Sequence, residues 1–250
     1  MESTGGTKRS RKRVQPKQLE LDLPTWGGAR KGAGRKRVAA KQRVRHRKRG
    51  VFDKAHPVHV TLRMRDDVPS LRTRGAWSVI VRVLRAARER YGLTVNQYAV
   101  LANHVHLIVE HDGGDSLSRG MRGLCTRLAA QLNALFRRTG PLLADRYHAR
   151  ALTTPLEVRR GLAYVLLNFR KHAYSAGRRM ATGWFDHRSS AAKFDGWRGP
   201  LRTRFSAFDF GTAPARTWLL GHGWRRHGLL ALEEVPASRE TSAKGERRAA

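Results

Sequence analysis

The stretch Asn-His-Val-His-Leu-Ile-Val-Glu at 103–110 constrains the fold more than any other part of this sequence. Side chains of a β-strand alternate between its two faces, so His104 and His106 share one face while Val105 and Leu107 lie on the other. Two neutral imidazoles side by side can bind one divalent ion if a third ligand comes from elsewhere. A strand that carries two incidental histidines is the simpler interpretation of so short a pattern.

The elements around this strand predict an α+β fold of the ferredoxin-like type. Alternation of apolar and polar residues predicts further strands over 57–65, 94–101 and 146–153, and apolar residues at helical spacing predict helices over 77–91 and 117–136. A last helix opens at Pro155, with Thr154 as its cap, and runs to about Ala173. The order β-α-β-β-α-β plus a C-terminal helix is solved most simply by one antiparallel sheet with helices on one face.

Charge divides the chain into three parts. The 250 residues carry a formal net charge of +32, and residues 1–50 alone hold 17 Lys or Arg against 3 Asp or Glu. We therefore expect a basic arm without fixed structure at 1–50, a folded domain at 51–176, and an irregular extension at 177–250 that is rich in aromatic and basic residues and contains short helices. So large a positive charge predicts a polyanionic partner, with nucleic acid as the leading candidate.

Several classes of protein are excluded by what the sequence lacks. Cys125 is the only cysteine, so the chain has no internal disulfide framework and no cysteine-based zinc site. The basic start is not followed by an apolar segment, and no run of apolar residues reaches the length of a membrane span. We expect no membrane association and a cytoplasmic, nucleoid-associated location.

The helix that begins at Pro155 places two chemically capable side chains together. Tyr164 and Asn168 are four residues apart, on the side of the helix opposite its apolar stripe, with Lys171 near them and Arg160 beside them. A phenol can act as a nucleophile on phosphorus, and an amide oxygen can bind a hard cation. A half-exposed tyrosine that packs over the Arg160 stem is the structural alternative.

Both motifs resemble those of a known enzyme family. The stretch 103–110 is similar to the metal-binding strand of the HUH single-strand endonucleases, and Tyr-Val-Leu-Leu-Asn at 164–168 resembles the nucleophile helix of the REP-associated tyrosine transposases. The resemblance covers about residues 55–197. It implies that His104, His106 and Asn168 bind Mg²⁺ or Mn²⁺, and that Tyr164 attacks the scissile phosphate of single-stranded DNA. The products would be a 5′-phosphotyrosine and a free 3′-hydroxyl.

The sequence departs from the family pattern in two places. Ala102 stands where a proline often precedes the histidine motif, and Phe169 stands where a proline commonly follows the asparagine. Without that proline we expect the last helix to continue unbroken to Ala173, which would change the position of Tyr164 relative to the ion.

The resemblance also implies a DNA partner, namely single-stranded or hairpin DNA, and leaves open whether the chain acts as a monomer or a homodimer. We expect the phosphate backbone to contact basic side chains of the arm and of the two later helices. These are Arg30, Lys31, Arg35, Lys36, Arg37, Arg119, Arg122, Arg127, Arg160 and Lys171.

Other interpretations compete with a transposase. A catalytically inactive nucleic-acid-binding relative of the same fold is the main alternative. Tyr147, beside His148 in the expected fourth strand, is a rival nucleophile. His59 and Thr61 invite comparison with phosphoesterases that act on small cyclic phosphates through two His-x-Thr/Ser motifs, although the second motif would lack its hydroxyl and the net charge does not suit such a substrate.

Overall fold

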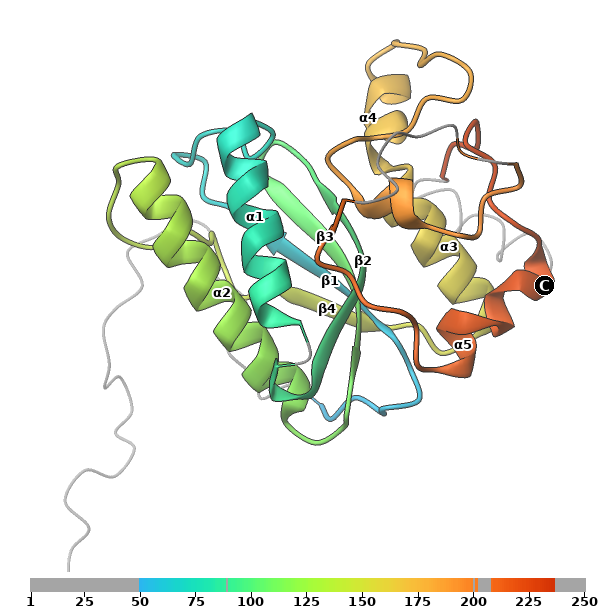
Figure 1. Cartoon of the computed structure of the whole chain (residues 1–250), viewed down its shortest axis with the longest axis horizontal. Coiled ribbons are helices and arrows are strands. Elements are labelled where there is room, and N and C mark those ends of the chain that lie inside the picture. The colour runs from blue at the N-terminus through green and yellow to red at the C-terminus, as the bar shows by residue number, and fades with distance from the viewer. Residues whose placement is uncertain (1–49, 89, 200, 202–207, 237–250) are drawn as a thin grey trace, which may run out of the picture. The chain divides into compact units, whose positions relative to one another are not determined.

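A four-stranded antiparallel sheet forms the centre of the protein (Figure 1). The computed structural model describes residues 50–88, 90–199, 201 and 208–236. The strands run in the spatial order β2-β3-β1-β4, and all three neighbouring pairs are antiparallel. Their bounds are Val58–Arg63 (β1), Leu93–Val100 (β2), His104–His111 (β3) and His148–Ala151 (β4). With one helix between β1 and β2 and another between β3 and β4, this is the expected ferredoxin-like α+β arrangement.

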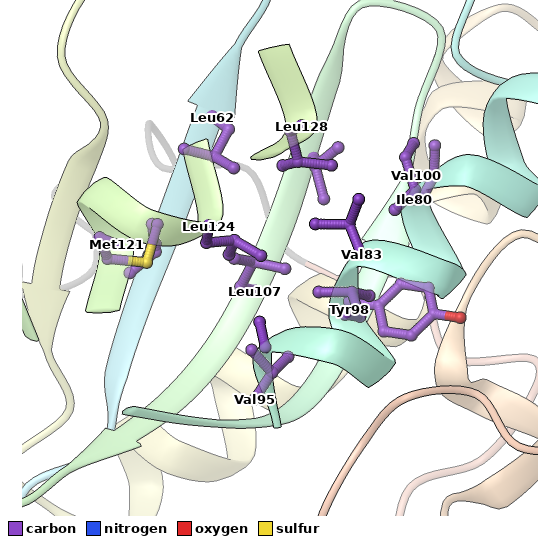
Figure 2. Close-up of a cluster of buried hydrophobic side chains, with 14 of the residues drawn as sticks. Leu62, Ile80, Val83, Val95, Tyr98, Val100, Leu107, Met121, Leu124 and Leu128 are labelled. Carbon is purple, nitrogen blue, oxygen red and sulfur yellow. The ribbon is translucent and has the colours of Figure 1, made fainter. Parts of the chain in front are cut away.

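The helices α1 (Arg74–Ala87) and α2 (Ser116–Leu135) cover one face of the sheet (Figure 1). Figure 2 shows the core between these helices and the sheet, where Leu62 of β1 and Leu107 of β3 lie among side chains such as Leu124 of α2. All three side chains are at most 1% exposed. A register slip of one residue would turn the histidines of β3 into this apolar layer, so the core fixes the register of the strand.

The remaining helices lie on the opposite face, where α3 (Pro155–Leu166) contacts β2 and β3 (Figure 1). Thr154 caps α3 by accepting a hydrogen bond from the Glu157 backbone N–H, as expected from the Thr-Pro sequence. Its apolar stripe, including Val158 and Leu162, packs with Ile108 of β3 in a second hydrophobic cluster. The expectation that helices cover only one face was therefore wrong. The last helix packs on the face of the sheet that carries the histidines.

The last helix is also interrupted, where an unbroken helix to Ala173 was expected. Leu167 (φ −106°, ψ 12°) separates α3 from α4 (Asn168–Ser175), and no proline is present at the break. The Phe169 ring contacts the Arg72 guanidinium, 4.1 Å from its centroid, and the Trp184 ring, whose centroid is 5.4 Å away. Tertiary contacts thus position α4 where the family pattern has a proline.

The C-terminal segment completes the core on the histidine face. It contains the short helical turns η2 (Ser190–Lys193), α5 (Trp218–Gly221) and η3 (Gly223–His227). Trp224 of η3 and Phe194, which follows η2, belong to the same hydrophobic cluster as the apolar stripe of α3. The buried Glu110 carboxylate of β3 accepts hydrogen bonds from the backbone N–H groups of Arg216 and Thr217. Two backbone donors therefore connect the end of β3 to the start of α5, and the Asn96 amide of β2 donates to the same carboxylate.

Two expectations concern residues or features beyond this core. The arm residues predicted to bind DNA, namely Arg30, Lys31, Arg35, Lys36 and Arg37, lie outside the described residues. Within the described part of the chain, no helix combines the length and the apolar character that crossing a bilayer requires.

Candidate active site

Strands β1 and β3 present a group of polar side chains to α3 and α4. Thr61 lies opposite His106 in the antiparallel register, and Arg63 lies opposite His104. The His104 and His106 ring centroids are 4.8 Å apart, and the His59 ring is 5.2 Å from that of His106. Strand alternation therefore brings together the pair that the sequence predicted and adds two side chains from the neighbouring strand.

One nitrogen of His106 is engaged and the other is not. Its Nδ1 lies 3.1 Å from His59 Nε2 and 3.1 Å from Thr61 Oγ1. Its Nε2 is buried and has no hydrogen-bond partner among the described residues. A buried imidazole nitrogen without a partner lowers stability, whereas a histidine that binds a metal must keep one nitrogen available for the ion.

His104 has a similar arrangement with a local partner. Its Nδ1 lies 2.8 Å from Asn103 Oδ1, an oxygen that can only accept, so the proton is on Nδ1 and the lone pair on Nε2. Burial lowers the pKa of His104 to about 4, and the charges of His172 and Arg63 act in the same direction. Burial likewise lowers the pKa of His106 to about 2, with His59 as the next contributor. Both imidazoles are neutral near pH 7, as metal binding requires.

Tyr164 lies over this pair. Its ring centroid is 5.2 Å from that of His106 and 5.6 Å from that of His59, both with an edge-on orientation. The Lys171 ammonium lies 4.8 Å from the centroid of the same phenol ring. Helix α3 thus places the predicted nucleophile beside the predicted metal ligands, and the Lys171 ammonium contacts the same ring.

Asn168, the first residue of α4, is fully buried. Neither Oδ1 nor Nδ2 of its amide has a partner within the described ranges. It lies one helical turn after Tyr164 and one before His172, whose ring is 6.1 Å from that of His104. The Tyr164 and His172 rings, four residues to either side of Asn168, thus each contact one member of the histidine pair.

These residues fit a divalent cation in their donor atoms. The buried Nε2 of His106, the Nε2 of His104 and the Oδ1 of Asn168 make a set of two imidazoles and one amide oxygen, which suits Mn²⁺ and is also compatible with Mg²⁺. No group of three His, Cys, Asp or Glu side chains in the described ranges is arranged to bind a metal.

The other predicted site residues separate between the two faces of the sheet. Arg160 and Lys171 belong to α3 and α4, on the histidine face. By contrast, Arg119, Arg122 and Arg127 lie on α2, which covers the opposite face (Figure 1). The rival Tyr147 packs against the core beneath α1 and α2 and is thus separated from the histidines by the sheet.

Three residues of the site were missed as members of it. His59 and Thr61 were considered only as one half of a phosphoesterase motif, yet both contact His106. Their alternation in β1 showed that they share a face, but only the pairing of β1 with β3 places them beside His106. His172 follows Asn168 by four residues, a spacing that the sequence already contained.

Two solved structures are similar to this chain. One is a REP-associated tyrosine transposase bound to a REP hairpin, with a TM-score of 0.44 and 17% identity over 52% of this chain and 76% of that chain. The other is a putative transposase from Deinococcus radiodurans R1, with a TM-score of 0.33 and 13% identity over 56% of this chain and 100% of that chain. No protein-family profile matches the sequence, and no curated protein matches it. These likenesses concern the fold.

Proposed function

We propose that this protein is a metal-dependent tyrosine transposase that nicks and rejoins single-stranded DNA. The observation that carries the proposal is the position of the Tyr164 ring, 5.2 Å from that of His106, whose buried Nε2 has no partner in the described part of the chain. A nucleophile and an open ligand position beside each other are what phosphoryl transfer to a tyrosine requires.

His104, His106 and Asn168 would bind Mg²⁺ or Mn²⁺. When bound, the ion would polarise a non-bridging oxygen of the scissile phosphate and stabilise the charge that develops there. The Tyr164 oxygen attacks phosphorus and loses its proton to solvent. The bond from phosphorus to the 3′-oxygen breaks, and that oxygen takes up a proton to leave a free 3′-hydroxyl. Attack of a 3′-hydroxyl on the phosphotyrosine reverses the step, so rejoining needs no external energy source.

Basic side chains near Tyr164 would contact the DNA backbone. Lys171 contacts the phenol ring, and Arg160, one helical turn before Tyr164, has an exposed side chain. The net charge of +32 supplies long-range attraction to the polyanion. We infer that single-stranded or hairpin DNA is the substrate, and that the tyrosine face of the sheet is where it is cut.

The test is covalent capture of labelled DNA. Incubation with a 5′- or 3′-labelled single-stranded hairpin and Mn²⁺ should give a protein–DNA adduct that survives denaturing electrophoresis, carries the strand 3′ to the cut, and is lost with EDTA. Tyr164→Phe should abolish it. Tyr174→Phe, at a tyrosine that is 61% exposed and near the end of α4, is the matched control and should retain it.

The competing functions give different results in the same experiment. Binding of the hairpin without any adduct, in wild type and variants alike, would favour a non-catalytic DNA-binding protein. Hydrolysis of a nucleotide cyclic phosphate that persists in Tyr164→Phe would favour a phosphoesterase. An adduct that survives Tyr164→Phe would place the nucleophile elsewhere and overturn the proposal.

A further inference from the structure

Strand β1 contributes two side chains that converge on one atom of the site. His59 Nε2 and Thr61 Oγ1 each lie 3.1 Å from Nδ1 of His106. Thr61 is the residue directly opposite His106 in the ladder, so backbone hydrogen bonds fix the separation of the two strands at this point. The convergence is a property of the sheet register and does not depend on the conformation of a loop.

Convergence on Nδ1 determines what the other nitrogen of His106 can do. A neutral imidazole carries one proton, so Nε2 has a lone pair for a cation only when the proton is on Nδ1. The Thr61 hydroxyl and His59 Nε2 can each donate to or accept from Nδ1. In the tautomer that leaves Nε2 open to a cation, both act as acceptors, and His59 then carries its own proton on Nδ1. Because His106 is 3% exposed, water does not compete with these acceptors.

The Nδ1 atoms of His104 and His106 find their hydrogen-bond partners in different parts of the chain. His104 uses Asn103, its neighbour in the chain, at 2.8 Å. His106 uses β1, whose residues are 45 and 47 positions away in sequence. His59 also contacts the Tyr164 ring, at a centroid distance of 5.6 Å, so the same side chain adjoins the metal ligand and the nucleophile.

We propose that His59 and Thr61 are positioning residues that keep the proton of His106 on Nδ1 and direct its Nε2 toward the metal ion. Loss of both acceptors allows the imidazole to adopt the other tautomer or to rotate, and either change removes the lone pair from the site. Partners of this kind behind a metal-binding histidine change metal affinity by about 10- to 100-fold. The inference rests on the proposed function, because it assigns the two residues to the same metal site.

The first experiment reads the tautomer directly in the full-length protein without metal or DNA. Two-bond ¹H–¹⁵N correlation spectra of protein labelled at its histidines should show His106 protonated on Nδ1, with the assignment made from His106→Ala. Thr61→Val keeps the shape of the side chain and removes the hydroxyl, and His59→Phe keeps a ring and removes the acceptor. In the double variant the Nε2-protonated form should become populated, whereas Thr61→Ser should preserve the wild-type spectrum.

The second experiment measures Mn²⁺ affinity by calorimetry or electron paramagnetic resonance. The double variant should bind about 10- to 100-fold more weakly, and Thr61→Ser should remain close to wild type. His227→Ala, at an exposed histidine of η3, controls for the loss of a histidine as such. The melting temperature and the metal-free affinity for hairpin DNA should not change in Thr61→Val. If the double variant fails to fold, Thr61→Val and His59→Phe as single variants should each populate the Nε2-protonated form in part and weaken Mn²⁺ binding, whereas Thr61→Ser should do neither.

The outcomes separate this inference from the proposed function. An unchanged tautomer and unchanged Mn²⁺ affinity in the folded variants would overturn the positioning role, even if the Tyr164 adduct forms. A shifted tautomer with weakened Mn²⁺ binding would support it, even if wild-type protein forms no DNA adduct and the transposase proposal fails.

Discussion

The two faces of the sheet differ in what they bury, although the same strands form both. On the face beneath α1 and α2, Leu62 and Leu107 belong to a continuous hydrophobic core. On the other face, the adjacent positions Thr61 and His106 are polar and are covered by α3 and α4. Neighbouring residues of one strand therefore serve stability and chemistry separately, and the parity of a position predicts which property a substitution will change.

The histidine face also buries polar atoms that have no hydrogen-bond partner among the described residues. Stable domains leave few buried polar atoms without partners, because each such atom lowers stability by about 1–3 kcal/mol. Within the described residues, His106 and Asn168 contribute three atoms of this kind, and others lie elsewhere, such as His111 Nε2 and Gln131 Oε1. If a ligand completes the site beside Tyr164, as proposed, substitutions on the two faces should have different effects.

The largest effect should separate His106 from its neighbour Leu107. Leu107→Ala creates a cavity in the core and should lower the free energy of unfolding by about 2–5 kcal/mol, measured by urea denaturation. His106→Ala should change it by no more than about 1 kcal/mol, yet reduce adduct formation at least about 100-fold. Equal destabilisation by the two substitutions would mean that the histidine face is only a second core.

A second prediction concerns Asn168, whose buried amide should stabilise the protein only when a metal ion is bound. Asn168→Ala removes two unpartnered polar atoms, so without metal the variant should be as stable as wild type or more so. Mn²⁺ at about 100 times its dissociation constant should stabilise wild type by about 2.7 kcal/mol, and the variant much less at that concentration. Asn133→Ala, on α2, should keep the wild-type response, since Asn133 bonds only locally to the 138–140 turn. A full Mn²⁺ response in Asn168→Ala would remove the amide from the ligand set.

A third prediction tests the contacts that replace the family's proline. Phe169→Ala removes the ring that contacts Arg72 and Trp184, so it should lower stability by about 1–2 kcal/mol. It should also reduce the rate of adduct formation about 10-fold or more, because α4 is then free to move relative to the histidines. Phe169→Pro should keep the break and lose less activity than Phe169→Ala. Trp218→Ala, at a half-exposed aromatic residue of α5, is the control.

The sequence contained the site's two motifs because both depend on local geometry. Period-2 alternation placed His104 and His106 on one face, and helical spacing placed Tyr164 and Asn168 together. The Thr154 cap followed from residue types alone and is present. None of these inferences needed to know how the elements pack.

What the sequence did not contain depends on contacts between distant residues. The face chosen by α3 is decided by which apolar surface it covers, including Ile108 and the aromatic side chains of the C-terminal segment. The break at Leu167 depends on a position for Phe169 that only the folded chain creates. The convergence of His59 and Thr61 on His106 depends on β1 pairing with β3, which alternation within one strand cannot reveal.

The smallest expected effect concerns two exposed arginines on opposite faces of the sheet. Arg160 lies on the tyrosine face and Arg122 on α2, and both side chains are exposed. If single-stranded DNA crosses only the tyrosine face, Arg160→Gln removes one phosphate contact. The slope of log affinity against log salt should then become shallower by about 0.7, with the cleavage site unchanged. Arg122→Gln should leave the slope as it is. Equal changes from both substitutions would mean that the DNA also follows α2, as the sequence analysis expected, and that the two faces share the binding of one substrate.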